Sequence, residues 1–287
     1  MSGAGTDLHV ARSRPTRWLL LAAAVTAGVV AFAPLVWMLA GSVRPGEEIL
    51  REAVPIGWHT LVPIRFTLDN LVALFSGPFL RAIVNSLLVA TISVVFGLVI
   101  NAMAGFAFAT MRFRGRDALF AVVVFSFLIP FEVLAVPLSQ AVRELGLTNS
   151  YLALVLPGIG NGLAVFMLRQ FFLAVPGELR EAAAVDGAGW WRVFTRIYLP
   201  LSIPALVSAG LLLFLFQWQA YLWPLLITTD RAMDVGPVAL ARFFDQYDVD
   251  YGQLFAGSAV LSLIPAMLLL RFQRTFTTSV ARSGVKG

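Results

Sequence analysis

The sequence predicts an all-α integral membrane protein with six transmembrane helices. Hydrophobic residues make up 59% of the 287 residues and charged residues only 13%, and the mean hydropathy is +0.83. Soluble domains usually carry about twice that charged fraction, so the excess apolar surface is expected to face lipid. Long uncharged segments alternate with short polar ones, and as helices these segments are long enough to cross about 30 Å of hydrocarbon.

The first uncharged segment, 18–43, is predicted to be a retained transmembrane helix that follows a cytoplasmic tail at residues 1–17. The motif Ala31-Phe32-Ala33 also fits the cleavage site of a signal peptide. However, Pro34 follows directly and the apolar run continues to Leu39, whereas the hydrophobic part of a signal peptide is shorter. We therefore place the first span at about residues 18–40.

Five further spans follow from the other uncharged runs. A mixed-charge loop at 44–81 precedes the second span, and a basic loop with Arg112, Arg114 and Arg116 separates the second span from the third. An acidic loop at 228–253 precedes the sixth span. The predicted spans cover about residues 82–111, 118–139, 151–173, 203–227 and 254–270. The transmembrane domain thus extends over 18–273, and a second tail, 274–287, ends the chain.

The distribution of basic residues predicts the orientation of these spans. Six spans place both termini on the same side of the membrane. If that side is the cytoplasm, 14 of the 21 basic residues lie inside, and an inside excess of Arg and Lys is typical of membrane proteins. The net charge of +5 is explained in this way, so it does not indicate binding to nucleic acid.

A polar stretch between the fourth and fifth spans is too charged to enter lipid, although its residues favour helix. Pro176 suits a helix start, Glu178 and Glu181 suit the positive end of the helix dipole, and Ala182–Ala184 are strong helix formers. Asp186 is a plausible N-cap for a second helix over 190–196, and Gly187 and Gly189 permit a turn before it. Leu199-Pro200 is expected to end the second helix. We call this predicted helix pair, residues 177–198, the bracket.

The alternative is an ordinary amphipathic linker that rests on lipid headgroups. The spacing of Glu181-Ala182-Ala183, Gly187 and Leu199-Pro200 resembles the signature of permease subunits of ABC importers. The wider sequence resembles the six-helix partner subunit of maltose-type carbohydrate importers. Supporting matches are Asn85-Ser86-Leu87, Ala104-Gly105-Phe106, Phe113-Arg114-Gly115-Arg116, Arg169-Gln170-Phe171-Phe172, Pro176-x-Glu178-Leu179, and Trp218 before Pro224-Leu225.

This resemblance implies the type I importer permease fold, a multi-pass location in a bacterial plasma (inner) membrane, and a bracket that docks on a cytoplasmic ATPase as a pair of coupling helices. The implied partners are a second permease subunit, two ATPase subunits that bind ATP and Mg, and an extracytoplasmic solute-binding protein. The chain itself is expected to bind no cofactor. The residues implied in ATPase coupling are Glu178, Glu181, Ala182, Ala183, Asp186, Gly187, Leu199 and Pro200.

Fewer residues are candidates for the solute pathway than for ATPase coupling, and each of them could instead have a purely structural role. Asn85 lies near the start of the second predicted span, and its alternative is a bond between neighbouring helices. Glu132 is the only acidic residue within a predicted span, where an ionisable group is costly, and its alternative is a bend at Pro130 and Pro137 that leaves it in headgroups or water. Gln217, Trp218 and Tyr221 offer the amide and aromatic groups that sugars bind, but they also fit an aromatic belt at the membrane interface. In the external loop, the candidates for contact with a binding protein are Asp245, Tyr247, Asp248 and Tyr251, and their alternative is a solvated acidic loop.

No catalytic or metal site is predicted from the sequence. There is no Cys, the two His residues are far apart, and no phosphate-binding P-loop pattern is present. The expected function is therefore the permease part of an ATP-driven importer for a di- or oligosaccharide, with a polyol or a glycerophosphodiester as alternative solutes. An ion-coupled secondary transporter, for which inverted repeats are typical, and a membrane scaffold for a cytoplasmic partner are the rival classes.

Overall fold

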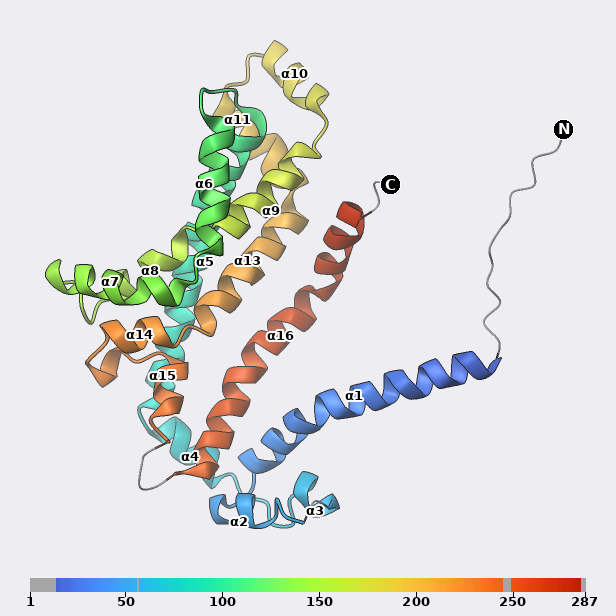
Figure 1. The fold of residues 1–287 in the computed structure, drawn as a ribbon, viewed down its shortest axis with the longest axis vertical. Helices are drawn as coiled ribbons and strands as arrows, with labels where there is room; N and C mark the ends of the chain where they lie inside the picture. The colour runs from blue at the N-terminus through green and yellow to red at the C-terminus, as the bar shows by residue number, and fades with distance from the viewer. Residues whose placement is uncertain (1–13, 56, 245–248, 285–287) are drawn as a thin grey trace. The chain divides into compact units, whose positions relative to one another are not determined.

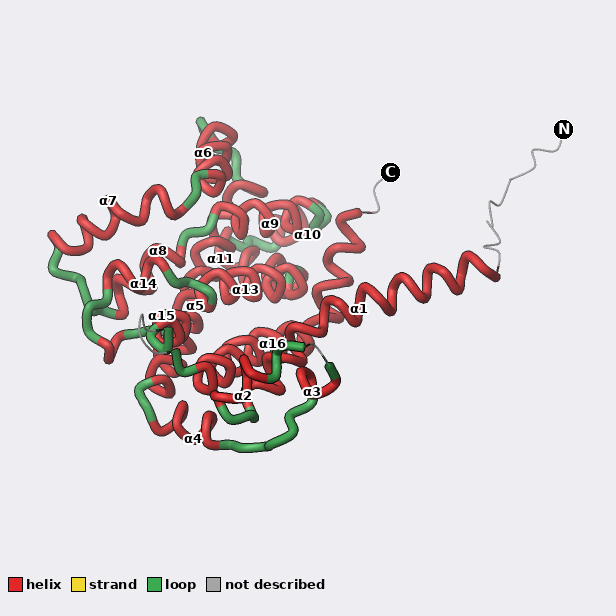
Figure 2. Tube along the Cα trace, turned by 60° about the horizontal axis from the view of Figure 1, so that its bottom comes forward, coloured by secondary structure: helices red, strands yellow, loops and turns green. Residues whose placement is uncertain are grey.

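The computed structural model describes residues 14–55, 57–244 and 249–284. These residues are helical apart from loops and one isolated bridge between Phe244 and Val249 (Figure 2). Three helices are each long and apolar enough to span a membrane: Trp18–Ser42, Phe79–Thr110 and Tyr251–Gln273. Three bent helix pairs pass the same test, so the described residues hold up to six spans.

The chain forms two compact units, which are described separately. The first contains the residues up to Leu71 together with Asp250–Ala259, and the second contains Val72–Val249 and the residues from Val260 onward. The long helix α16, Tyr251–Gly284, contributes to both, and the short helix α4, Asp69–Ser76, crosses the boundary.

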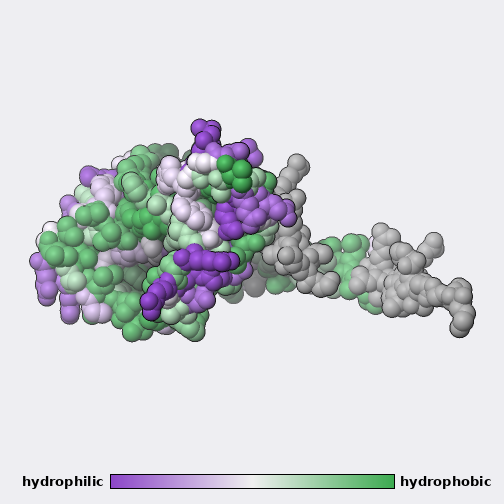
Figure 3. Space-filling view, turned by 90° about the horizontal axis from the view of Figure 1, so that it is seen from above, coloured by the Kyte–Doolittle hydropathy of each residue, from purple (hydrophilic) through white to green (hydrophobic). Residues whose placement is uncertain are grey.

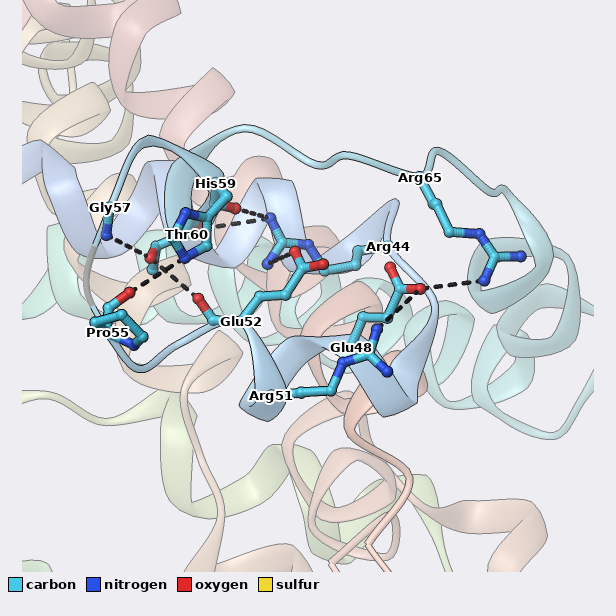
Figure 4. Close-up of polar contacts among 9 residues, drawn as sticks. All are labelled: Arg44, Glu48, Arg51, Glu52, Pro55, Gly57, His59, Thr60 and Arg65. Carbon is cyan, nitrogen blue, oxygen red and sulfur yellow. Dashed lines mark hydrogen bonds and ion pairs between the residues drawn. The ribbon is translucent and has the colours of Figure 1, made fainter.

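The first unit joins helix α1, Arg14–Ser42, to the short helices α2, Gly46–Arg51, and α3, Trp58–Leu61. Arg44, whose side chain is 1% exposed, lies 3.3 Å from Glu52 and donates a 2.7 Å hydrogen bond to the carbonyl of His59 (Figure 4). Glu48 is paired with Arg65 at 3.1 Å. These contacts hold a loop without a large apolar core in a defined conformation.

Helix α5, Phe79–Thr110, is the centre of the second unit, and α8, α9 and α13 pack along it (Figure 1). Their bounds are Tyr151–Ile159, Gly162–Leu173 and Ile203–Trp218. Small residues allow close approach: a Cβ on Gly105 would lie 3.1 Å from the backbone nitrogen of Arg169. Such small-residue contacts are typical of helix packing in membranes.

The sharpest of the three bends has a local cause in the sequence. Helices α6, Arg116–Leu128, and α7, Phe131–Glu144, meet at 96°. Pro130 lacks an N–H and disfavours helical geometry at Ile129, which is extended. The predicted span 118–139 therefore consists of two helices in the structure. The predicted span 203–227 is also divided, into α13 and α14, Leu222–Ile227.

The break between α8 and α9, with a bend of 44°, is stabilised by a polar residue of α5. The fully buried Asn101 donates to the carbonyls of Gly97 and Ile159 at 2.7 and 2.9 Å and accepts from the N–H of Asn161 at 3.0 Å. Asn161 in turn caps α9 through the N–H of Ala164. Backbone N–H and C=O groups that lose their helical partners at a helix break within the membrane need such hydrogen bonds.

The remaining elements connect these helices. The polar stretch forms α10, Gly177–Val185, then α11, Trp190–Val193, a π-helical turn η1, Phe194–Tyr198, and α12, Leu199–Leu201. The run from Trp190 ends at Leu201, and α13 follows at an angle of 83°. The predicted end at Leu199-Pro200 is thus two residues early. After α14 come the 3₁₀ turn η2, Arg231–Met233, and α15, Gly236–Ala241.

Candidate functional site

The turn between α10 and α11 is a Schellman motif. Gly187 has a φ of 74°, its N–H donates to the carbonyl of Ala184 at 3.1 Å, and the N–H of Ala188 donates to that of Ala183 at 2.9 Å. This pair of bonds satisfies carbonyls that a helix end otherwise leaves free. The expected role of Asp186 as an N-cap is wrong: Asp186 ends α10, and the residue before α11 is Gly189.

One face of the bracket packs on the transmembrane helices. Ala183 and Ala188 lie against a buried cluster that includes Phe106 of α5. The ring of Phe106 lies 5.0 Å from those of Phe194 and Tyr198, centroid to centroid. The bracket is therefore in direct side-chain contact with the central helix α5.

The other face of the bracket is open in this chain. The side chain of Glu181 is 74% exposed, with Arg180 as its only ion-pair partner in the described residues, at 3.8 Å. Glu178, Ala182 and Asp186 are exposed, and Val185 is 88% exposed. Figure 3 views the molecule from the end that carries α10 and α11, where hydrophilic residues gather in patches with hydrophobic ones between them. Such a surface, with small, acidic and apolar side chains, suits a protein partner.

Arg180 and Tyr198 connect the two faces. The guanidinium of Arg180 donates to the carbonyl of Thr110, at the end of α5, at 3.5 Å. Burial raises the pKa of the Tyr198 phenol, while the nearby charge of Arg180 lowers it. The net shift is upward, so Tyr198 stays neutral at physiological pH and serves as a packing residue.

The bracket residues predicted from the sequence are brought together, but they divide between the two faces. Ala183 is half-buried against its own transmembrane core, whereas Ala182 is exposed. Leu199 also packs on the buried cluster. Sequence reasoning included Phe106 only as part of a family match and assigned no role to it or to Arg180, because their roles depend on a contact between α5 and the bracket.

Asn85 is engaged in bonds within the chain. It is 2% exposed, and its amide nitrogen donates to the carbonyls of Ala232 and Asp234 at 2.9 and 2.8 Å. Its amide oxygen accepts from the hydroxyl of Tyr151 at 2.8 Å. The neighbouring Ser86 accepts from the N–H of Gly236. These bonds tie the segment from η2 to α15 to the start of α5, and they leave the Asn85 amide little capacity for a solute.

The three candidates on and after α13 lie in different surroundings. Gln217 donates to the carbonyl of Leu154 at 3.2 Å, and its amide oxygen fills the space that a Cβ on Gly158 would need. Trp218 is 2% exposed and donates to the carbonyl of Leu261 at 3.0 Å. Only Tyr221, 44% exposed, presents an open side chain.

The remaining candidates are on the surface or outside the described residues. Glu132 is exposed in the first turn of α7. Asp245, Tyr247 and Asp248 lie outside the described residues, and Tyr251 is half-buried at the start of α16. Within the described ranges, no group of three or more His, Cys, Asp or Glu side chains is arranged to hold a metal ion.

Comparison with known proteins places this architecture in a family. The family described as "Binding-protein-dependent transport system inner membrane component" matches residues 93–281. The arabinooligosaccharides transport system permease protein AraQ of Halalkalibacterium halodurans is 35% identical over 94% of this chain and 96% of the relative. The trehalose transport system permease protein SugB of Mycobacterium tuberculosis is 31% identical over 96% of this chain and 98% of the relative.

The fold has a counterpart among solved structures. A crystal structure of a bacterial ABC transporter involved in the import of the polysaccharide alginate contains a chain that matches with a TM-score of 0.77 and 20% identity. The match covers 92% of this chain and 98% of that chain. The chain is thus an inner-membrane transport component, not an ATPase, and it belongs to the binding-protein-dependent ABC transporter permeases, in the branch that contains AraQ and SugB.

Proposed function

We propose that this permease forms half of the pathway through which a di- or oligosaccharide enters the cell, and that it is driven by a separate ATPase through the bracket. The observation that carries the proposal is the two-sided bracket: one face packs on Phe106 of α5, and the other exposes Glu181, Ala182 and Val185. An element that is exposed to a partner on one face and packed on the transmembrane helices on the other can transmit movement from the partner to those helices.

The proposed assembly contains a second permease subunit, two cytoplasmic ATPase subunits that bind ATP and Mg, and an extracytoplasmic solute-binding protein. Both termini and the bracket lie in the cytoplasm, in agreement with the excess of Arg on that side. When ATP closes the ATPases, the brackets of the two permeases approach each other. Through Phe194 and Tyr198 this displacement reaches Phe106, and the transmembrane helices open toward the outside to accept solute.

A sugar is the proposed solute because relatives over nearly the full chain are named for transport of arabinooligosaccharides and trehalose. Of the candidates for a solute pathway, Tyr221 is the one whose side chain is open and aromatic. Polyols and glycerophosphodiesters remain as alternative solutes. A thermal-shift screen of the partner binding protein against these three classes identifies the solute, since that protein binds it first.

The test is reconstitution of the whole complex in proteoliposomes. Uptake should need ATP, and solute-loaded binding protein should stimulate ATP hydrolysis. Glu181→Ala should abolish this stimulation and leave basal hydrolysis by the ATPase unchanged. Uptake that persists without any ATPase subunit would support an ion-coupled carrier instead, and a stable ATPase complex without uptake would support a scaffold.

A further inference from the structure

A shallow basic hollow lies in the loop between α5 and α6, outside the bracket. It has a volume of about 400 Å³ and is lined by Arg112, Phe113, Gly115, Arg116, Asp117 and Ala118. The start of α6 is at the same end of its unit as α11 (Figure 1). In the proposed topology this end faces the cytoplasm, at the level of the lipid headgroups.

The conformation of this loop is well supported. The ring of Phe113 packs on that of Phe108 at 6.1 Å, and Phe108 packs on Phe120 at 5.4 Å. Gly115, with a φ of 81°, makes the left-handed turn that begins α6. The hollow is therefore a consequence of packing on α5 and α6, and it does not depend on a loose surface loop.

The charges in the hollow are not balanced by the residues that the structure describes. Arg116 is paired with Asp117 at 2.9 Å, whereas Arg112 and Arg114 make no hydrogen bond or ion pair with any described residue. Nearby, Arg169 and Arg180 reach the last turn of α5, where they donate to the carbonyls of Phe108 and Thr110. Arg180 also lies 3.8 Å from the carboxylate of Glu181, which is exposed on α10. The local excess is positive, and guanidinium groups bind phosphate in a forked geometry.

Apolar surface continues directly from the hollow. None of the residues of α6 is buried, and Leu119, Val122 and Phe125 are 51%, 64% and 63% exposed. An acyl chain placed along α6 would cover these side chains while its headgroup reached Arg112. Neither a free phosphate nor a soluble phosphoester would use both surfaces.

We propose that Arg112 and Arg116, with the ring of Phe113, form a binding site for the phosphodiester headgroup of an anionic phospholipid such as phosphatidylglycerol, whose acyl chains lie against α6. The site is distinct from the bracket and is not part of the solute pathway. Arg112 binds the phosphate with its unpaired guanidinium, and Arg116 contributes the N–H groups that Asp117 does not occupy.

Native mass spectrometry of the purified transporter complex tests this site. Phosphatidylglycerol, phosphatidylethanolamine and phosphatidylcholine with the same acyl chains are added in turn, and bound lipid is counted. Phosphatidylglycerol should be retained most strongly. Because the proposed contact is a charge-assisted hydrogen bond between the Arg112 guanidinium and the phosphate, Arg112→Gln should reduce the retention of phosphatidylglycerol about tenfold or more.

Two control variants distinguish a defined lipid-binding site from general electrostatic attraction between basic residues and anionic lipid. Arg114→Gln removes the same charge from the same loop but not from the lining of the hollow, and Arg231→Gln removes an exposed charge from η2. Both should retain phosphatidylglycerol nearly as the parent does, and Arg112→Lys should retain an intermediate amount. The proposal is overturned by equal loss in Arg112→Gln and Arg114→Gln, by equal retention of the three lipids, or by displacement of the lipid with inorganic phosphate. Lipid retention needs neither ATP nor solute, so such a failure would leave the proposed transport function untouched.

Discussion

Replacement of Gly187 by Ala would test whether the left-handed turn of the bracket is needed for coupling. Gly187 has a φ of 74°, and a Cβ built on it would meet nothing within 4 Å. The substitution therefore introduces no clash, and its whole effect is backbone strain. For Ala that strain is about 1 kcal/mol, which corresponds to about a fivefold change in an equilibrium constant.

Gly189 provides a matched control two residues away. A Cβ there also meets open space, but its φ of −70° is available to any residue. Gly189→Ala should thus change nothing, and Gly187→Asn should fall between the two because Asn tolerates the left-handed region better than Ala. The two Ala variants add the same methyl group in open space, so they differ in the conformational demand of the backbone.

The assay is the affinity of the permease pair for the ATPase subunit, measured by titration in detergent, together with ATP hydrolysis stimulated by the solute-loaded binding protein. Gly187→Ala should weaken the affinity up to about fivefold without loss of the folded transmembrane domain. If Gly187→Ala and Gly189→Ala gave the same affinity, the Schellman turn would have no part in docking.

Three further predictions concern other parts of the chain. Asn85→Ala should destabilise the purified protein by about 1–3 kcal/mol, because two buried carbonyls lose their donor; a change in solute preference without a drop in thermal stability would contradict this structural role. Arg44→Met should destabilise the first unit by leaving Glu52 without its partner, and the double variant with Glu52→Met should recover only part of the loss in thermal unfolding, because the carbonyl of His59 still lacks its donor. Phe106→Ala should uncouple ATP hydrolysis from uptake in proteoliposomes while the ATPase still binds, since the cavity lies between the bracket and α5; unchanged coupling would exclude this route.

The resemblance and the helix positions could be read from the sequence because both are local properties. A long uncharged run such as 82–111 has one low-energy state in lipid, and the structure has α5 at Phe79–Thr110. The turn at Gly187 was likewise expected from Gly alone. The N-cap predicted at Asp186 was wrong, because several residues near Gly187 and Gly189 could begin a helix. The Schellman bonds of Gly187 and Ala188 end α10 at Asp186, and Gly189 precedes α11.

The partners of polar side chains were decided only by the tertiary structure. From the sequence, Asn85 could line a solute pathway or bond a neighbouring helix. In the structure, α5 packs against the segment from η2 to α15, more than 140 residues later, and the Asn85 amide donates to the carbonyls of Ala232 and Asp234. The sequence by itself determined that this chain crosses the membrane and carries a polar bracket, since transfer into lipid depends on composition and length. Which face of that bracket is attached to Phe106 and which is open depended on the folded structure, because burial is a property of neighbours that are distant along the chain.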